Sequence, residues 1–249
     1  MQANPESTQF GEKHVTPDEK TQAVRGVFDS VADNYDLMND LMSGGIHRLW
    51  KDRLVRMIRP KPGLKYLDVA GGTGDIAFRI HKKAPEAAIT VCDLNEHMLD
   101  VGRSRAIDKA WLGGFDWVTG NAEDLPFPDN SFDVYTIAFG LRNVTRIDTA
   151  LAEAARVLKP GGRFFCLEFS HVQEPIIAKA YDLFSFKVIP RIGKLVAKDK
   201  DSYQYLVESI RKFPKQKDLA KRMESAGLKN AGFTNLSAGI ATIHFGIKP

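Results

Sequence analysis

The segment Asp68 to Gly74 has the residue types of a cofactor pocket. It joins the end of a short apolar run, 65–69, to the start of a helical pattern, and it contains Gly72 and Gly74. Glycines let a backbone pass close to a ligand, and the following helix directs unpaired N–H groups over the turn. The turn therefore predicts a site for a nucleotide-type cofactor, with the Asp68 carboxylate beside it.

Two classes of cofactor fit such a turn. Gly72, Gly74 and Ala77 satisfy the GxGxxA form of the dinucleotide fingerprint, which favours a nicotinamide or a flavin. Asp68 argues against a dinucleotide, because a carboxylate opposes a pyrophosphate but suits the ammonium of an amino-acid group. The chain also lacks a second nucleotide-binding half. Asp93, at the end of the next strand pattern, is expected to accept both ribose hydroxyls in either class. Together these features predict S-adenosylmethionine (SAM).

The loop after the third predicted strand supplies another pair of candidates. Asn121 and Ala122 follow the apolar run 115–119. Ligands collect at the carboxyl ends of the strands in a doubly wound sheet, so the pair is expected beside the ligand of Asp93. A backbone amide and a short side chain there can bind the adenine edge. The alternatives are that Asn121 is a turn residue, and that Asp68 and Asp93 cap a helix or brace a loop.

Strand and helix patterns alternate through the middle of the chain, which predicts a parallel sheet with helices on both faces. Asn95 and Thr145 are predicted N-caps. Two apolar runs near the C-terminus, 231–237 and 240–247, are so close that they must pair as an antiparallel hairpin. The predicted fold class is α/β, a mostly parallel seven-stranded sheet ending in this hairpin. The other strands are expected at 65–69, 88–92, 115–119, 132–138 and 162–168, and helices at 75–83, 96–108 and 146–158, with a stop at 159–162.

Five segments are expected along the chain. They are a flexible N-terminal arm (1–17), a helical cap (18–60), a SAM-binding core (61–170), a helical lid insertion (171–227) and the hairpin that completes the sheet (228–249). Apolar residues of the lid are interleaved with basic ones. Two compatible interpretations follow: the apolar face packs on the domain while the lysines reach water, or it lies on a membrane surface and admits a greasy substrate.

Composition indicates an ordinary soluble globular protein. The chain has 249 residues, of which 43% are hydrophobic, and a formal net charge of +4. Cys92 and Cys166 lie in apolar runs and are expected to be buried, reduced thiols, which suits a cytoplasmic location. The first residues lack the features of a secretory signal or a transit peptide. Basic residues are dispersed, which argues against nucleic acid as a partner.

Several motifs resemble those of the class I SAM-dependent methyltransferases. The segments 68–74, 126–133 and 158–162 resemble their three motifs. The more specific stretches 35–50, 139–143 and 199–209 are similar to the UbiE/COQ5 family, the C-methyltransferases of ubiquinone and menaquinone biosynthesis. The resemblance covers nearly the whole chain. It implies a Rossmann-like fold, SAM as methyl donor, and methylation of a ring carbon of a polyprenylated benzoquinol (2-polyprenyl-6-methoxy-1,4-benzoquinol type), of demethylmenaquinol, or of both.

The resemblance also implies particular cofactor contacts. By position they fall on Thr73, Asp93 and the pair Asn121 and Ala122. Many family members have a serine where this chain has Ala138. Ala138 can offer only backbone groups, and one neutral hydrogen bond contributes about 0.5–1.5 kcal/mol, so a modest loss of cofactor affinity is expected.

Methylation of an arene carbon requires a neighbouring hydroxyl to lose its proton. Arg142, just past the fourth predicted strand, is expected to orient a water or to stabilise the phenolate. The alternative is a structural bridge from Arg142 to Asp124 or Glu168. His47 is either a base at neutral pH or a packing histidine beside Trp50. No metal is expected, since none of the six histidines lies in a ligand cluster. The candidate contacts of the quinol are Tyr35, Asn143, Asp201 and Tyr203.

Competing functions stay open at this stage. The superfamily motifs alone also allow an O- or N-methyltransferase of small molecules. The glycine turn allows a nicotinamide oxidoreductase, and a non-catalytic SAM-binding scaffold of a quinone-biosynthesis complex is a further alternative. The expected partner is a polyprenyl quinol. Peripheral contact with the inner membrane surface, a biosynthetic complex and a homodimer are left open.

Overall fold

The computed structural model of the chain describes residues 8–10, 13–16, 19–20, 22–24, 26, 40, 43–172 and 200–249, without the side chains of 8–14, 200–204 and 206. The predicted quinol contact Tyr35 lies outside the described residues. So do the part of the predicted lid from 173 to 199 and most of the helix predicted at the start of the cap. The contacts of Asp201 and Tyr203 also lie outside the description, although both residues belong to a described helix.

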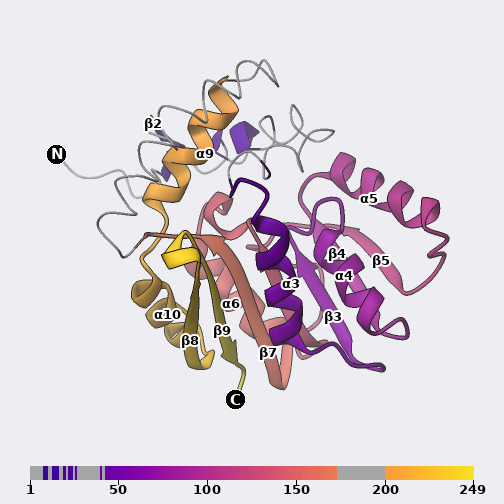
Figure 1. Cartoon of the computed structure of the whole chain (residues 1–249). Helices are drawn as coiled ribbons and strands as arrows, with labels where there is room; N and C mark the ends of the chain where they lie inside the picture. Colours follow the sequence, from indigo (N-terminus) through magenta and orange to yellow (C-terminus); the bar gives the residue numbers. More distant parts are fainter. Residues whose placement is uncertain are drawn as a thin grey trace.

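A seven-stranded sheet forms the centre of the molecule (Figure 1). Its pairs are parallel except those of the strand Ala241–Ile247, which is antiparallel to both of its neighbours. This confirms the predicted fold class. In spatial order the strands are β5 (Phe115–Thr119), β4 (Ala88–Asp93), β3 (Lys65–Val69), β6 (Phe132–Ala138), β7 (Leu158–Phe169), β9 (Ala241–Ile247) and β8 (Lys229–Leu236).

The strand order creates a switch point between β3 and β6. The chain moves outward from β3 through β4 to β5 and then returns to the opposite side of β3 as β6. The connections after β3 and β6 therefore leave the sheet in opposite directions. In open α/β sheets the crevice at such a point, outside the carboxyl ends of the strands, binds ligands.

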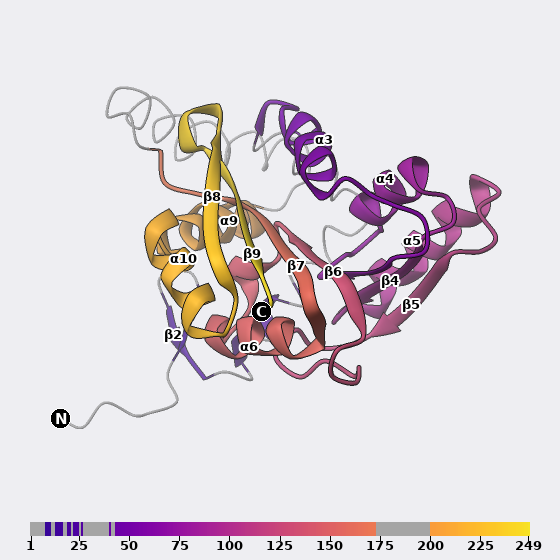
Figure 2. The same ribbon diagram turned by 90° about the horizontal axis from the view of Figure 1, so that it is seen from below.

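Helices cover both faces of the sheet (Figures 1 and 2). One face, here called the α3 face, carries α3 (His47–Ile58), α4 (Asp75–Lys83) and α5 (Glu96–Asp108). The other, the α6 face, carries α6 (Ile147–Val157) and α10 (Gln216–Ser225). Successive strand residues enter opposite cores, so Tyr66 packs on the α3 face and Leu67 on the α6 face. Both sides of the central strands are thereby buried.

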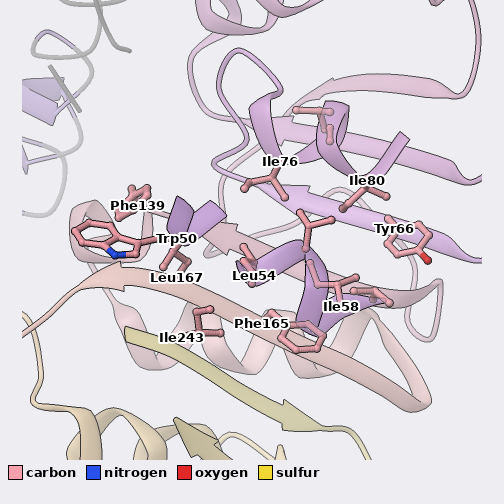
Figure 3. Packing of buried hydrophobic residues seen from close by; sticks show 14 of the residues in the cluster. Trp50, Leu54, Ile58, Tyr66, Ile76, Ile80, Phe139, Phe165, Leu167 and Ile243 are labelled. Atoms are coloured by element: carbon pink, nitrogen blue, oxygen red, sulfur yellow. The ribbon is translucent and has the colours of Figure 1, made fainter. Parts of the chain in front are cut away.

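The core of the α3 face fixes α3 against the sheet (Figure 3). Trp50, Leu54 and Ile58 lie on one side of this helix and are almost fully buried. They contact side chains of α4 and of the central strands, among them Ile76 and Leu167. Burial of a large apolar side chain contributes about 1.5–3 kcal/mol, so this stripe holds a helix of only 12 residues in place.

Most predicted elements are confirmed, but one predicted N-cap is wrong and one predicted strand begins earlier than expected. Asn95 is the N-cap of α5, since its side chain accepts a hydrogen bond from the Met98 N–H at 3.3 Å. Thr145 is not an N-cap, because α6 begins one residue later and the Thr145 N–H donates to Glu123 Oε1. The segment 159–162 ends α6 but is part of β7, where the Gly161 N–H donates to the Lys248 carbonyl at 2.8 Å.

The ends of the chain add further elements. β1 (Thr8–Phe10) and β2 (Lys13–Val15) pair antiparallel within the residues expected to form a flexible arm. The described part of the predicted lid forms α9 (Lys200–Lys212) and α10. α10 packs on β8 and β9 with Leu219 and Met223 fully buried, so it belongs to the layer of the α6 face. Among the described helices, none is both long and apolar enough to cross a membrane.

Candidate active site

A cavity opens at the switch point, outside the carboxyl ends of β3, β4 and β6. Its wall comes from the turn after β3, the end of β4, the loop after β5, the end of β6 and one side of α3. Segments far apart in the sequence therefore meet here. The predicted site residues that line it are Asp68, Gly72, Thr73, Asp93, Asn121, Ala122, Ala138 and Asn143.

The glycine turn shapes the floor of this cavity. Gly72 has φ +53° and Gly74 has φ +82°, in the left-handed region that favours glycine. Gly74 is the N-cap of α4, and a Cβ on it would lie 2.8 Å from Cη2 of Trp117. Gly74 is not among the residues of the cavity wall. It serves the pocket indirectly, because it allows α4 to start at the cavity.

Asp68 presents a buried carboxylate oxygen that has no partner. The residue is 1% exposed and its Oδ1 accepts a hydrogen bond from Thr136 Oγ1 at 2.7 Å. Within the part of the chain that the structure describes, Oδ2 has no hydrogen-bond partner. Burial raises the pKa of this carboxyl to about 7, against the opposing effect of the Thr136 hydrogen bond. Since a buried carboxylate needs a compensating charge, the geometry fits a cationic group of a ligand in the cavity.

Asp93 combines the two roles that the sequence left open. Its Oδ2 accepts from the Gly72 N–H at 2.8 Å, and its Oδ1 accepts from the Asn95 N–H at 2.9 Å. The carboxylate therefore braces the glycine turn. A carboxylate has about four acceptor positions, and Asp93 lines the cavity, so the site fits a diol such as that of a ribose.

Thr73 and Asn121 hold neighbouring parts of the wall. Thr73 Oγ1 accepts a hydrogen bond from Arg105 Nη1 at 2.9 Å. Asn121 Oδ1 accepts from the Glu123 N–H at 3.0 Å, which makes Asn121 a turn residue that also lines the cavity. Ala122, beside it, is 8% exposed. This wall offers backbone groups and a small side chain, as a planar heterocycle requires.

An ion pair that the sequence analysis missed also borders the cavity. Lys51 Nζ lies 2.7 Å from Asp75 Oδ2, and both residues belong to the wall. Burial alone would raise the pKa of the Asp75 carboxyl, but the charge and hydrogen bond of Lys51, joined by Arg79, lower it to about 2. The spacing of Lys51 along α3 gave no signal, because only the docking of α3 beside α4 brings it to the cavity.

Arg142 forms the structural bridge to Glu168 that was one of its two predicted roles. Arg142 Nη1 donates to Glu168 Oε1 at 2.5 Å and to the Phe139 carbonyl at 2.7 Å. Both ionic side chains are fully buried. The Nε and Nη2 atoms of Arg142 have no hydrogen-bond partner among the described residues. Arg142 is not among the cavity-lining residues of the described part of the chain.

The neighbouring Asn143 connects the cavity with α9. Its side chain lines the cavity, and its Oδ1 accepts a hydrogen bond from Tyr205 Oη at 3.1 Å. Burial raises the pKa of Tyr205, so its hydroxyl stays protonated at neutral pH. Tyr205 was missed by the sequence analysis, which selected Tyr203. The two lie on the same helix, and a helical phase is needed to tell which one points inward.

His47 lies outside the cavity wall formed by the described residues. It is 1% exposed, and its Nε2 is 2.8 Å from Asp40 Oδ1, whereas Nδ1 has no partner. Burial, followed by the charge of Lys51, lowers the pKa of His47 against the opposing effect of Asp40. The base role of His47 stays a prediction.

Several solved structures with a similar fold are named methyltransferases. A SAM-dependent methyltransferase from Aquifex aeolicus has a TM-score of 0.58 at 14% identity, over 94% of this chain and 100% of that chain. Phosphoethanolamine N-methyltransferase 2 from Haemonchus contortus, in complex with SAM, has a TM-score of 0.59 at 15% identity, over 80% and 52%. The fold and the cavity at its switch point are those of a Rossmann-like class I methyltransferase.

The sequence narrows this class to one family. The chain belongs to the ubiE/COQ5 methyltransferase family, whose model matches residues 16–248. A relative from Brucella abortus (strain S19) is 57% identical over 96% of this chain and 90% of its own. One from Dinoroseobacter shibae is 56% identical over 97% of each chain. Both carry the name ubiquinone/menaquinone biosynthesis C-methyltransferase UbiE.

Proposed function

We propose that this protein transfers the methyl group of SAM to a ring carbon of a polyprenyl quinol in ubiquinone or menaquinone biosynthesis. The names of the relatives at 56–57% identity support the reaction class. The observation that carries the proposal is the cavity at the switch point, with the unpartnered Asp68 Oδ2 inside it. That oxygen fits the ammonium of the methionyl group.

The residues of the cavity divide among the parts of SAM. Asp68 would bind the ammonium, Asp93 the ribose hydroxyls, and the segment of Asn121 and Ala122 the adenine. Ala138, at the end of β6, would contribute backbone groups only. The sulfonium supplies an already activated methyl group, so the chain has to position the two reactants and exclude water.

The polarity of the site favours this reaction. A phenolate that attacks a sulfonium loses its charge as the bond forms, so a dry site of low dielectric constant favours the transition state. Phe139 and Phe169, which flank Arg142, are almost fully buried. The Tyr205 hydroxyl, which donates to Asn143 Oδ1, supplies a polar group next to this segment of the chain.

We assign to Arg142 the stabilisation of the phenolate, through its Nε and Nη2. Both donors are buried and without a partner, and a guanidinium stays protonated. A phenolate oxygen accepts such donors well, and preorganised donors of this kind contribute about 2.7–4 kcal/mol to a transition state. Glu168 would hold the guanidinium in orientation. Tyr35, Asn143, Asp201 and Tyr203 remain the proposed contacts of the quinol, and His47 the alternative base.

Product analysis tests this function. The protein is incubated with methyl-labelled SAM and with reduced, short-tail demethylated benzoquinol or naphthoquinol, and mass spectrometry locates the label. We expect methyl on a ring carbon. Methyl on oxygen, or no transfer to either quinol although SAM binds, would contradict the proposal.

A further inference from the structure

The charges that line the cavity are unbalanced. Four of its side chains are acidic, whereas Lys51 is the one cation among the described residues of the wall. A SAM molecule brings a sulfonium, an ammonium and a carboxylate into such a site. Asp68, Asp93 and the wall around them account for the positive and hydroxyl groups, and no residue has so far been assigned to the carboxylate. The acidic residues are Asp68, Asp75, Asp93 and Glu123.

The Lys51 side chain is held in place on several sides. It is 3% exposed, its Nζ lies 2.7 Å from Asp75 Oδ2, and it stands 5.9 Å from the centre of the Phe139 ring. The preceding residue, Trp50, packs its ring edge-on against Phe169 and donates from Nε1 to Ser237 Oγ at 3.0 Å. Figure 3 shows Trp50 and Leu54 directed into the core of the α3 face. Burial and these contacts therefore hold the Lys51 side chain at the cavity wall.

Its ammonium has donors to spare. An ammonium carries three N–H donors, and Asp75 is the one hydrogen-bond partner of Nζ among the described residues. Nζ also lies beside the start of α4, since Asp75 is the first residue of that helix. The N-cap Gly74 has no side chain to satisfy the first N–H groups of α4. An anion next to Lys51 would meet both kinds of donor.

The Asp68 carboxylate would bind a cationic group of the ligand on the same side of the cavity. Its unpartnered Oδ2 belongs to the strand that runs into the glycine turn, and α4 follows that turn directly. A ligand group with adjacent positive and negative charges would satisfy both the Asp68 carboxylate and the Lys51 ammonium. The α-amino acid group of SAM has this arrangement.

We propose that Lys51 binds the α-carboxylate of the methionyl group, with Asp75 as the residue that positions the Lys51 ammonium. The assignment rests on the proposed use of SAM and adds a specificity to it. The protein would discriminate against decarboxylated forms of the cofactor, which keep the adenosine, the sulfur and the ammonium. Recognition of the amino-acid group would thus depend on two charged residues from different elements, Asp68 on β3 and Lys51 on α3.

Two ligands that differ only in the carboxylate test this. Calorimetry compares S-adenosylhomocysteine with its decarboxylated form, S-adenosyl-3-thiopropylamine, on the full-length protein. A charge-assisted hydrogen bond is worth roughly ten- to a hundredfold in affinity, so we expect the wild type to prefer S-adenosylhomocysteine by that factor. In Lys51→Met the preference should fall to about threefold or less, through weaker binding of S-adenosylhomocysteine.

The chain offers matched controls. Lys83→Met removes an exposed lysine from the other end of α4 and should leave the preference unchanged. Lys51→Arg keeps the charge and should retain most of the preference. Lys51→Met is expected to fold, because Asp75 Oδ1 keeps its contact with Arg79 Nε at 2.9 Å.

The outcomes separate this assignment from the proposed function. If the wild type binds neither ligand, the proposed use of SAM fails. If it binds both equally, only the carboxylate assignment is overturned, and this result does not depend on any variant folding. If Lys51→Met slows turnover but keeps the wild-type preference, Lys51 acts on the methyl acceptor, and the assignment is again overturned.

Discussion

Two ion pairs lie near the cavity, and they differ in burial and in the number of partners that each charged group has. In the first pair, Lys51 with Asp75, the carboxylate is partly exposed and also binds Arg79. In the second, Arg142 with Glu168, both side chains are fully buried and two guanidinium nitrogens have no partner. In the first pair the carboxylate is satisfied by two cations and only the Lys51 ammonium keeps donors, which point to the cavity. In the second pair the spare donors lie on a fully buried guanidinium, and the carboxylate depends on that one cation.

The carboxyl groups of the two pairs respond in opposite directions. Lys51 and Arg79 outweigh burial at Asp75 and lower its pKa to about 2. At Glu168 burial outweighs the charge of Arg142 and the hydrogen bonds that the carboxylate accepts, so its pKa is raised. An ion pair in which burial outweighs the partner's charge contributes little to stability, because buried charges lose more solvation free energy than a single contact returns. This difference agrees with the role in phenolate stabilisation that we propose for Arg142.

Loss of the cation should destabilise the second pair far more than the first. Arg142→Met leaves the Glu168 carboxylate buried without its partner, which costs about 3–5 kcal/mol of unfolding free energy. Lys51→Met should cost about 1 kcal/mol or less, because Asp75 is partly solvated and keeps Arg79. Urea denaturation at pH 8 measures both. Equal losses of unfolding free energy in the two variants would contradict this difference between the two ion pairs.

The pH dependence of the same variant adds a check. The raised pKa of Glu168 means that the folded state prefers its protonated form, so Arg142→Met should regain stability as the pH falls through that pKa. The lowered pKa of Asp75 has the reverse sign, because its contribution is present above about pH 4 and is lost towards pH 2. Glu168→Gln in the Arg142→Met background should abolish the gain at low pH.

That double variant also isolates the catalytic role of Arg142. With both charges removed no buried carboxylate is left unpaired, so Arg142→Met/Glu168→Gln should fold. Turnover should fall by about 100- to 1000-fold, the usual effect of losing one preorganised donor, while the Kd of S-adenosylhomocysteine changes by less than about threefold. Methyl-transfer kinetics and calorimetry provide the two values. A parallel loss of affinity would make the pair a binding or folding element instead.

Substitution of Asp93 should affect binding of the methyl donor, SAM, and not binding of the quinol. Asp93→Ala removes the ribose acceptor and the brace on the Gly72 and Asn95 N–H groups, so SAM affinity should fall tenfold or more, at 1.4 kcal/mol per decade. Asp93→Asn is the matched control, because it keeps the shape and one acceptor oxygen and should lose less. Unchanged affinity in Asp93→Ala, measured by calorimetry, would exclude this carboxylate from the cofactor site.

The sequence correctly predicted that Asp68, Asp93 and Asn121 would lie together at one site, whereas their contacts with the cofactor stay predictions. Asp68 and Asp93 lie at the carboxyl ends of β3 and β4, and Asn121 follows β5. The topology of a parallel sheet alone brings such positions to one edge. The signal for the β8–β9 hairpin was also local, because its two strands are nearly adjacent in the chain. Signals of this kind depend on a few neighbouring residues and on one rule of sheet construction.

The residues that were missed depend on how separate elements dock. Lys51 reaches the cavity only because α3 packs beside α4, and Tyr205 reaches Asn143 only because α9 lies over the segment after β6. The N-cap prediction at Thr145 missed a contact of the same kind, because Glu123, 22 residues away, accepts from the N–H groups of Thr145 and Arg146 where α6 begins. A pattern within one helix cannot indicate such partners.

The smallest expected effect is on the pH dependence of cofactor binding. It compares the Asp68 carboxylate with that of Asp75, which is paired with Lys51 and Arg79. Burial raises the pKa of Asp68 to about 7 in the free protein, and the ammonium of the ligand should pair with the ionised form. Affinity for S-adenosylhomocysteine should therefore be nearly constant above pH 7 and fall as the pH decreases, by up to tenfold per pH unit. Calorimetry in buffers of different ionisation enthalpy should also detect a proton released on binding near pH 6.5.

The control for this prediction is Asp68→Asn, which keeps the acceptor for Thr136 Oγ1 but cannot ionise. It should bind S-adenosylhomocysteine more weakly at pH 8 and show no slope between pH 6 and 8. Asp75 titrates near pH 2 and cannot produce a slope in this range, so the Asp75→Asn variant should keep the wild-type slope. A slope that survives in Asp68→Asn would assign the titration to another group, and the unpartnered Oδ2 would then bind no cation of the ligand.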